Sequence, residues 1–526
     1  MAGIRGEARR RSVFSALTAG GAVCTMTIEE SVERSPPGLM CPMRKSLVLI
    51  LAGLLGGATA LSAMPFRRAD ANADGTVDVA DAVKTLSVLF LGDATAPCRD
   101  ALDANDDGVV DIADAITTLG FLFAQGKNPP PPFAACGVDP TSDTLTCDAF
   151  PPCDYGAGGC EDGMQASGSL YRICMPPAAA YNGRLIIWAH GYQDAGEPIA
   201  IPEDQMRFGD YYLPELMTSL GFAFATNSYS KTGLAVRQGV ADILDLVEIF
   251  KELRGEPLKI YVTGASEGGL ITTLLVEGHP AVFTGGLAAC GPIGDWEFQM
   301  KYFGDGRALF EYFFPGLIPG DPFDPAPDVV ASWPARYAGI VQPAVLDPAH
   351  RGALEQLARC ANLQVDPEDF LGSAEVCVRD FLRYSVVNLT DAAATLGGFP
   401  FDNVATRYTG SEDDDALNAG VVRVAADAAA LAEIRAGYST TGALQRPLLT
   451  IHTLYDSQVP FEHHVMYTEK CRLQGTEETF HYGFAVERFG HCEFTDEEVL
   501  AAFALMLIAG GDAELLESLP DLLSAP

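Results

Sequence analysis

The residues best suited to nucleophilic chemistry are a serine between glycines, a late histidine and an aspartate that lies between the two in the chain. Ser266 stands in Gly264-Ala265-Ser266-Glu267-Gly268, after the apolar run KIYVT and before the run LITTLLVE. This context predicts a tight strand-to-helix turn, in which glycines let neighbouring backbone pass closely. A serine hydroxyl attacks a carbonyl carbon only when a base removes its proton, so the chain must also supply a histidine and a carboxylate.

His491 is the best candidate for the base among the eight histidines. It lies in RFGHCEFTDEE, a loop-like segment that precedes the helix-like run EEVLAAFALMLI. His190 is better placed to shape the loop beside the serine, and His452 falls within a predicted strand, where a core histidine is expected. His463 and His464 closely follow the predicted acid and could line the site without acting as the base.

Asp456 is the predicted acid because it ends the strand-like run LLTIHTLYD, 35 residues before His491. Asp295, which follows the strand-like GGLAACGPIG, is the alternative acid. A tetrahedral intermediate also needs two preorganised backbone N–H donors, and losing one such donor costs about 2.7–4 kcal/mol. We expect these oxyanion-hole donors from Glu267, directly after the serine, and from Tyr192 in His190-Gly191-Tyr192. No cofactor is expected for this catalysis.

Two Asp-rich stretches repeat each other at a distance of about 33 residues, DANADGTVDVAD from Asp70 and DANDDGVVDIAD from Asp103. Side-chain oxygens fall at loop positions one, three, five, nine and twelve, and position six is Gly75 or Gly108. This spacing suits Ca²⁺, which takes oxygen ligands around a sharp glycine turn and uses a backbone carbonyl at position seven. The predicted calcium ligands are Asp70, Asn72, Asp74, Thr76, Asp78 and Asp81, and Asp103, Asn105, Asp107, Val109, Asp111 and Asp114.

Each loop is followed by apolar residues at helical spacing, which predicts a helix after each loop. The spaced residues are Val83, Leu86 and Leu89 in the first copy and Ile116, Leu119 and Leu122 in the second. Position twelve carries Asp rather than the Glu of EF-hands, and no helix cleanly precedes either loop. In these features residues 66–126 resemble the dockerin family, which implies a calcium-stabilised module that docks onto a cohesin-like or cell-surface partner.

The segment after residue 169 alternates short apolar runs with longer amphipathic ones. The strand-like runs are RLIIWAHG (184–191), FAFATNSY (222–229), LKIYVTGAS (258–266) and RPLLTIHTLYD (446–456), and GLAVRQGVADILDLVEIFKEL is helix-like. This alternation predicts an α/β fold, a mostly parallel sheet with helices on both faces. Chemistry in such sheets lies at the carboxyl ends of the strands.

With the HG turn, the serine turn, the Asp loop and the His loop in this order, residues 184–510 resemble the α/β-hydrolase superfamily. The resemblance implies acyl transfer through an acyl-serine intermediate. One departure is an insertion of about 150 residues, 295–443, which we expect to be a large cap over the active site that selects the substrate. Its aromatic residues are more often cap core than substrate platform: Trp296, Phe298, Tyr302, Phe303, Phe310, Tyr312, Phe313 and Phe314.

The segment from Met43 has the charged, apolar and small-residue layout of a signal peptide, which predicts a secreted, extracellular or periplasmic protein. Translation could start at Met1, Met40 or Met43, and no stable membrane anchor is expected because the apolar run is short. Eleven cysteines lie beyond the predicted cleavage point, so disulfides are expected and at least one thiol is left over. For Cys492 we consider a disulfide with Cys471 that ties down the His491 loop, or a buried thiol.

Acidic residues number 70 against 34 basic ones, a formal charge of −36, which argues against nucleic acid as a partner. The 526 residues favour more than one folded unit. The predicted units are an extension with signal peptide (1–63), the dockerin-like module (64–127), a Pro/Gly/Cys-rich linker and lead-in (128–168), the catalytic domain (169–510) and a tail (511–526).

These features together predict a secreted serine hydrolase, with a carboxylic-ester hydrolase favoured. A serine peptidase or amidase of the same fold is the alternative, so the expected substrate is an ester or a peptide. A non-catalytic, calcium-dependent binding or scaffolding protein is the third possibility, and its sequence would lack a triad residue or a working serine turn.

Overall fold

The computed structural model describes residues 12–17, 23–28, 66–74, 76–92, 96, 98–124, 126–133, 139–141, 143–147, 149–150, 158–209 and 211–518. Near the N-terminus, β1 (Ser12–Leu17) pairs antiparallel with β2 (Val23–Ile28). The predicted signal peptide and Gly75 of the first Asp-rich loop lie outside the described residues.

An eight-stranded sheet, in the order β12-β11-β10-β9-β5-β8-β4-β3, organises the large domain. All neighbours from β12 to β8 are parallel, whereas β4 runs antiparallel to both β8 and β3. The mostly parallel α/β sheet predicted from the sequence is confirmed. The strands are β3 (Gly159–Met164), β4 (Leu170–Met175), β5 (Arg184–Ala189), β8 (Ala223–Asn227), β9 (Lys259–Ala265), β10 (Gly285–Ala289), β11 (Leu448–Tyr455) and β12 (His481–Phe489).

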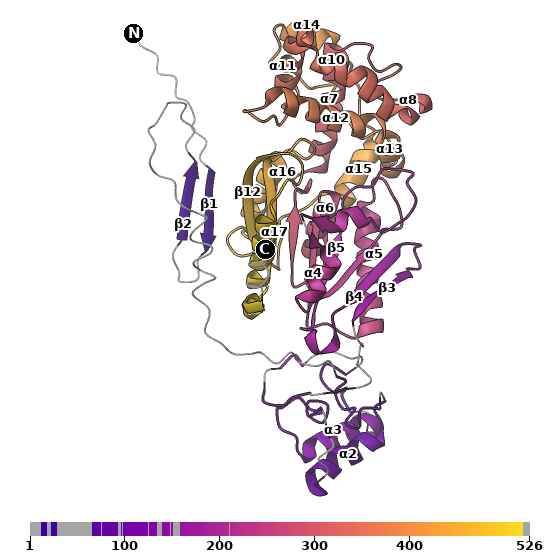
Figure 1. Cartoon of the computed structure of the whole chain (residues 1–526), viewed down its shortest axis with the longest axis vertical. Helices are drawn as coiled ribbons and strands as arrows, with labels where there is room; N and C mark the ends of the chain where they lie inside the picture. The colour runs from indigo at the N-terminus through magenta and orange to yellow at the C-terminus, as the bar shows by residue number, and fades with distance from the viewer. Residues whose placement is uncertain are drawn as a thin grey trace. The chain divides into compact units, whose positions relative to one another are not determined.

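Two hydrophobic layers cover the sheet because successive residues of a strand face opposite sides. On one side Leu185 and Ile187 of β5 pack with helices α5 (Val236–Arg254), α6 (Glu267–Gly278) and α16 (Glu462–Gln474). On the other side Ile186 joins a cluster built from α4 (Leu213–Ser219) and α17 (Asp496–Ala509). Figure 1 shows α4 and α5 flanking β5. Short pieces join these elements: η2 (Ala178–Ala180), η3 (Glu203–Met206), β6 (Arg207–Phe208) and β7 (Tyr211–Tyr212).

The chain between β10 and β11 is helical throughout its regular elements and forms its own hydrophobic cluster, which includes Tyr302, Phe310 and Phe314. Its outer helices gather at the top of Figure 1. Three members of the predicted aromatic group are therefore core of this insertion. Its helices are α7 (Trp296–Phe313), α8 (Pro327–Ala331), α9 (Trp333–Arg336), η4 (Tyr337–Val341), α10 (Gln342–Leu346), η5 (Pro348–His350), α11 (Arg351–Cys360), α12 (Phe370–Val386), α13 (Leu389–Leu396), α14 (Asp414–Gly420) and α15 (Ala428–Gly437).

Regular elements of the large domain lie outside the predicted limits of 169 and 510 at both ends. Strand β3 lies within the segment expected to be linker, and its largely exposed sequence GCEDGM carries no apolar signal. At the other end, η6 (Ala513–Ser518) follows Asp512, which is fully buried. Asp512 accepts hydrogen bonds from Arg184 (2.8 Å), Lys259 (2.6 Å) and Tyr261 (2.6 Å), so the start of the predicted tail is anchored to β5 and β9.

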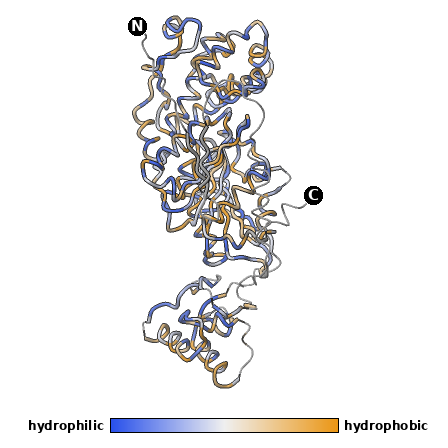
Figure 2. Tube along the Cα trace, turned by 90° about the vertical axis from the view of Figure 1, so that its left-hand side faces the viewer, coloured by the Kyte–Doolittle hydropathy of each residue, from blue (hydrophilic) through white to orange (hydrophobic). Residues whose placement is uncertain are grey.

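A loop and a helix occur twice in residues 66–126, as the repeat predicts. Helices α2 (Val79–Phe90) and α3 (Ile112–Phe123) begin at Asp78 and Asp111, which accept hydrogen bonds as N-caps. Figure 2 shows apolar residues along both helices. Equivalent apolar side chains are exposed in both copies, namely Val79 and Val83 in the first and Ile112 and Ile116 in the second.

Candidate active site

Ser266, His491 and Asp456 form one continuous chain of hydrogen bonds at the carboxyl ends of the strands. The Oγ of Ser266 lies 2.9 Å from Nε2 of His491, and Nδ1 of His491 lies 2.8 and 2.9 Å from the two carboxylate oxygens of Asp456. Ser266 follows β9 and Asp456 follows β11, whereas His491 comes from the loop between β12 and α17. The structure thus brings together three residues that are up to 225 positions apart.

The acid and the base of this chain perturb each other's titration. Burial by itself would raise the pKa of Asp456, but the charges of His491 and His452 and their hydrogen bonds outweigh it and lower that pKa well below its usual range. Burial would lower the pKa of His491, but the adjacent Asp456 carboxylate more than compensates and raises that pKa. A histidine held by a carboxylate on one nitrogen and a serine hydroxyl on the other is arranged to take a proton from the serine.

The turn that carries Ser266 has the strained backbone expected of a nucleophile turn. Ser266 has φ +57°, in the left-handed region, and its N–H donates to the carbonyl of Ala289 on β10. A Cβ on Gly268 would lie 2.0 Å from the carbonyl oxygen of Ala189, so only glycine fits there. This close approach of α6 to β5 fixes the serine at the end of the sheet.

The two predicted oxyanion-hole residues lie on either side of Ser266. Glu267 is the next residue in the chain, and a Cβ on Gly191 would come within 3.3 Å of the Cβ of Ser266, so the turn before Tyr192 packs against the serine. Among the described residues, the backbone N–H groups of Tyr192 and Glu267 donate to no protein acceptor. Gln205 holds this turn, because its Oε1 accepts from Gly191 N at 2.6 Å and its Nε2 donates to Tyr192 O at 3.3 Å.

The side chain of Glu267 points into the protein rather than into the site. It is buried, its Oε1 accepts a hydrogen bond from the N–H of Ala235 at 2.8 Å, and burial raises its pKa to about 8. Any contribution of Glu267 to an oxyanion hole therefore comes from its backbone.

The other histidines considered from the sequence occupy structural positions. His190 stacks on Tyr229 with ring centroids 3.8 Å apart, its Nδ1 lies 2.7 Å from Gly191 O, and burial lowers its pKa to about 4. His463 accepts hydrogen bonds from the N–H groups of Gly294 and Asp295. His464 is buried near His481, and neither His463 nor His464 lines the cavity at Ser266.

Asp295, the alternative acid, begins helix α7 and accepts from the N–H of Glu297 at 2.9 Å. It is the N-cap of that helix, whereas the hydrogen bonds of His491 to a carboxylate go to Asp456.

Sequence reasoning missed two supports of the acid. His452 was expected to be a core histidine and is buried, but its Nε2 also lies 3.5 Å from Oδ2 of Asp456. From the insertion, the carboxylate of Asp380 accepts from the Ser457 hydroxyl at 2.6 Å. The sequence contains one signal for this contact. His452 lies four residues before Asp456, and at the end of a strand two residues with this spacing can face the same side.

A disulfide joins Cys492 to Cys290, which corrects both possibilities considered for Cys492. Cys471 is a buried free thiol on α16, on the opposite side of the sheet from α17. The sequence could not reveal the pairing, because 202 residues separate the two bonded cysteines. The described residues also contain the disulfides Cys98–Cys147 and Cys160–Cys174, and free Cys360 and Cys377.

The two Asp-rich loops have the same local geometry in both copies. The N–H of Asp74 donates to Asp70 and Asn72 at 3.1 and 3.0 Å, and the N–H of Asp107 donates to Asp103 and Asn105 at 3.2 and 3.1 Å. Asp81 and Asp114, both fully buried, each accept two backbone hydrogen bonds within their own loops. The donor set consists of carboxylate, amide and carbonyl oxygens, which is the chemistry that Ca²⁺ prefers.

No protein-family model and no curated protein matches the chain. Solved structures give matches of low identity. The acylaminoacyl peptidase of Pyrococcus horikoshii is 13% identical over 68% of this chain and 42% of that chain, with a TM-score of 0.32. Esterase Pf2001 of Pyrococcus furiosus is 11% identical over 67% of this chain and 89% of that chain (TM-score 0.34). The Francisella virulence factor BioJ is 12% identical over 67% and 85% (TM-score 0.35).

The chain thus spans less than half of the length of the acylaminoacyl peptidases that it matches. In the described residues, no helix is long and apolar enough to cross a membrane.

Proposed function

We propose that the protein is a serine hydrolase in which Ser266, His491 and Asp456 act as the catalytic triad. The observation that carries this proposal is the unbroken chain of hydrogen bonds from the Ser266 hydroxyl through His491 to Asp456. The raised pKa of His491, caused by the Asp456 carboxylate in spite of burial, suits a general base that later returns its proton as an acid.

The reaction follows from this arrangement in two acyl transfers. Ser266 Oγ bonds to the carbonyl carbon of the substrate while its proton moves to Nε2 of His491, and the backbone N–H groups of Tyr192 and Glu267 bind the oxyanion. Collapse of the tetrahedral intermediate breaks the bond to the leaving group, which takes the proton from His491. A water then attacks the acyl-serine in the same way, which releases a carboxylic acid and restores Ser266.

A carboxylic ester is the favoured substrate class, and a peptide or amide is the alternative. The favoured substrate class is supported by the mainly apolar walls of the cavity at Ser266, to which Leu216, Met217 and Phe503 belong. The charged residues at this cavity are Arg207 and Arg383. An amide requires protonation of a poorer leaving group by the same His491, so the triad alone does not separate the two classes.

The deciding experiment compares hydrolysis of p-nitrophenyl esters with that of aminoacyl-p-nitroanilides by the protein and its Ser266→Ala variant. We expect ester turnover that disappears in the variant. Turnover of anilides alone would favour the peptidase. Labelling of the wild type, but not of Ser266→Ala, by a fluorophosphonate would separate a reactive serine from an inert scaffold with the same fold.

We further propose that residues 66–126 bind two Ca²⁺ ions and dock the enzyme to a cohesin-like or cell-surface partner. Support comes from the equivalent hydrogen bonds that Asp74 and Asp107 make in the two loops and from the exposed apolar side chains at equivalent positions of α2 and α3. Asp70, Asp74, Asp78 and Asp81 would hold one ion together with Asn72 and Thr76. Asp103, Asp107, Asp111 and Asp114 would hold the other together with Asn105 and Val109. The ions would supply structural stability and take no part in acyl transfer.

Secretion to an extracellular or periplasmic compartment completes the proposal. The signal-peptide pattern from Met43 supports it, as do the three disulfides of the described residues, because such bonds persist in oxidising compartments.

A further inference from the structure

A cavity of about 370 Å³ extends from the triad into the layer between the sheet and helices α4 and α17. Ser266 and His491 line it at one end. Its walls come from the strands through Ile186 and Phe224, from α4 through Met217, and from α17 through Phe503. Its volume lies in the range of ligand sites in proteins.

The cavity occupies one face of the sheet. Ile186 and Trp188 of β5 line it, whereas Leu185 and Ile187 alternate with them and pack on the opposite side. Because side chains of a strand alternate between the two faces, the cavity enters the α4–α17 side and leaves the α5–α6 side closed. A chain bonded to Ser266 would thus run into the hydrophobic interior of the catalytic domain rather than into the insertion.

Several polar side chains around the cavity have partners within the protein. Gln205 holds the turn of Gly191, Gln458 accepts from the Tyr384 hydroxyl at 3.0 Å, and Arg383 pairs with Asp194 at 2.8 Å. The guanidinium of Arg207 lies over the ring of Tyr212, 4.7 Å from its centroid. Among the described residues, the indole N–H of Trp188 is a buried donor without an acceptor. An apolar ligand leaves all of these pairs intact.

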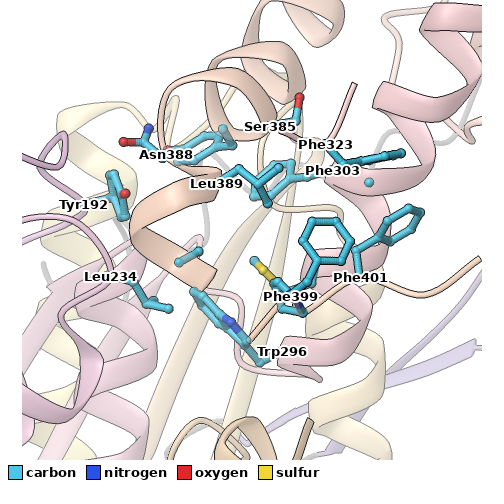
Figure 3. A pocket seen from close by; sticks show the side chains of 15 residues that line it. Tyr192, Leu234, Trp296, Phe303, Phe323, Ser385, Asn388, Leu389, Phe399 and Phe401 are labelled. Carbon is cyan, nitrogen blue, oxygen red and sulfur yellow. The ribbon is translucent and has the colours of Figure 1, made fainter. Parts of the chain in front are cut away.

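The insertion holds a second, smaller cavity of about 70 Å³, and Figure 3 shows that it is enclosed mainly by rings. Trp296 and Phe303 of α7 line it together with Phe399 and Phe401. Tyr192 and Tyr384 line both cavities and stand between them, with their rings in an edge-to-face contact at 5.5 Å. The smaller cavity therefore lies behind a wall of two tyrosines, away from Ser266.

We propose that the cavity between the sheet and helices α4 and α17 binds the acyl group of the substrate, and that this group is a medium-length hydrocarbon chain. The assignment rests on the proposed function, because it concerns the acyl group that Ser266 would carry. In this proposal the residues that select the acyl group lie on α4 and α17. From the sequence we expected substrate selection in the insertion. The smaller aromatic cavity does not contact the acyl group.

The test measures kcat/KM for p-nitrophenyl acetate, butyrate, octanoate and decanoate. Each methylene that enters the cavity is expected to raise kcat/KM by about fourfold until the cavity is full. Met217→Trp, which fills the cavity from α4, should lower the octanoate-to-acetate ratio by at least about tenfold. Val499→Trp fills it from the first turn of α17, where the side chain is half-buried, and serves if the buried Met217 site does not tolerate tryptophan.

The matched control is Leu389→Trp, which fills the smaller aromatic cavity (Figure 3). This variant should keep the wild-type octanoate-to-acetate ratio. A ratio that falls in Leu389→Trp and stays unchanged in Met217→Trp and Val499→Trp would overturn the proposal and assign the acyl chain to the insertion. A wild-type kcat/KM that declines steadily from acetate onward would overturn it as well.

A binding experiment keeps this proposal separate from the catalytic one. The Ser266→Ala protein should bind dansyl-undecanoic acid with an increase in fluorescence, and adding Met217→Trp or Val499→Trp should abolish the increase. If no ester and no fluorophosphonate reacts with Ser266 but this binding pattern is found, the proposed hydrolase activity fails and the apolar site stands. If esters react and the probe binds equally well to all variants, the hydrolase stands and the acyl site fails.

Discussion

Cys492 is bonded to Cys290, so the residue after His491 is tied covalently to the residue that follows strand β10. Both cysteines have positive φ, +58° for Cys492 and +45° for Cys290, which shows that the disulfide connects two tight turns. The base of the triad therefore sits on a loop that is fixed at the same edge of the sheet as Ser266, whose N–H donates to the neighbouring Ala289.

Removing this disulfide should lower both kcat and the stability of the protein, with the larger effect on kcat. In Cys290→Ala/Cys492→Ala the His491 loop loses its anchor, and we expect kcat to fall at least about tenfold, with about 2–5 kcal/mol less stability. The matched control is Cys160→Ala/Cys174→Ala, which removes the β3–β4 disulfide at the far edge of the sheet. The test measures kcat and urea unfolding for both double variants. An equal kcat in the two would contradict a role of the Cys290–Cys492 disulfide in positioning His491.

Asp456→Asn should lower kcat by about ten-thousand-fold, the loss typical of a triad whose histidine is held in the wrong tautomer. The amide would donate to Nδ1 of His491, and Nε2 would then carry the proton and could not accept one from Ser266. Asp295→Asn is the control, since Asp295 caps α7 and has no contact with His491. Steady-state kinetics on p-nitrophenyl butyrate compares them, and a larger loss in Asp295→Asn would reverse the assignment of the acid.

The pH dependence of kcat/KM should show an acid limb set by His491. The base accepts a proton only when neutral, so activity falls as pH drops through its pKa. Although burial opposes it, the Asp456 carboxylate raises this pKa above its usual value of about 6.5. We therefore expect half-maximal kcat/KM above pH 6.5. Replacing Asp456 by Asn removes the raising charge and should move the midpoint to lower pH, and an unmoved midpoint would mean that another group controls the limb.

Gly268→Ala should disrupt the serine turn. The added Cβ would lie 2.0 Å from Ala189 O and 2.6 Å from His190 O, which are backbone atoms that cannot move away cheaply. We expect a loss of about 3 kcal/mol in stability and of fluorophosphonate labelling. Gly278→Ala at the end of the same helix has open space and should be neutral or gain about 0.5 kcal/mol. Unchanged labelling in both variants would show that the serine turn still forms when α6 and β5 lie farther apart.

Chelation should unfold residues 66–126 while Ser266 stays reactive. With Ca²⁺ removed by EGTA, carboxylates such as Asp81 and Asp114 remain buried in loops without the cation that offsets their charges, so we expect the first calorimetric transition to fall in temperature. Fluorophosphonate labelling measured in parallel should not change. Restoring Ca²⁺ should restore the transition more fully than Mg²⁺ does. Loss of labelling on chelation would contradict separate roles for the loops and the catalytic domain.

The sequence predicted the parts of this protein whose signals are local. Strands β5, β8, β9 and β11 are continuous apolar runs, and the Asp-rich loops repeat their spacing, so each could be placed without the structure. Strand β3 could not, because an exposed edge strand such as GCEDGM needs no apolar pattern. The partner of Cys492 and the contact of His452 with Asp456 depend on how β10, β11 and the late loop meet.

The position of the cavity between the sheet and helices α4 and α17 is also a product of packing. Met217 and Phe503 are ordinary apolar residues of amphipathic helices, and nothing in their spacing distinguishes a filled core from a hollow one. A space in a core is left by the shapes of side chains from several elements, and one-dimensional patterns do not contain that information.

The buried ion cluster at Asp512 bears on the order in which the domain is assembled. Arg184 meets its carboxylate across 328 residues of chain and Lys259 across 253. Both cations therefore emerge from the ribosome long before Asp512, and strands β5 and β9 acquire this counter-charge only after Asp512 has been synthesised. Long-range closure of this kind slows folding relative to synthesis.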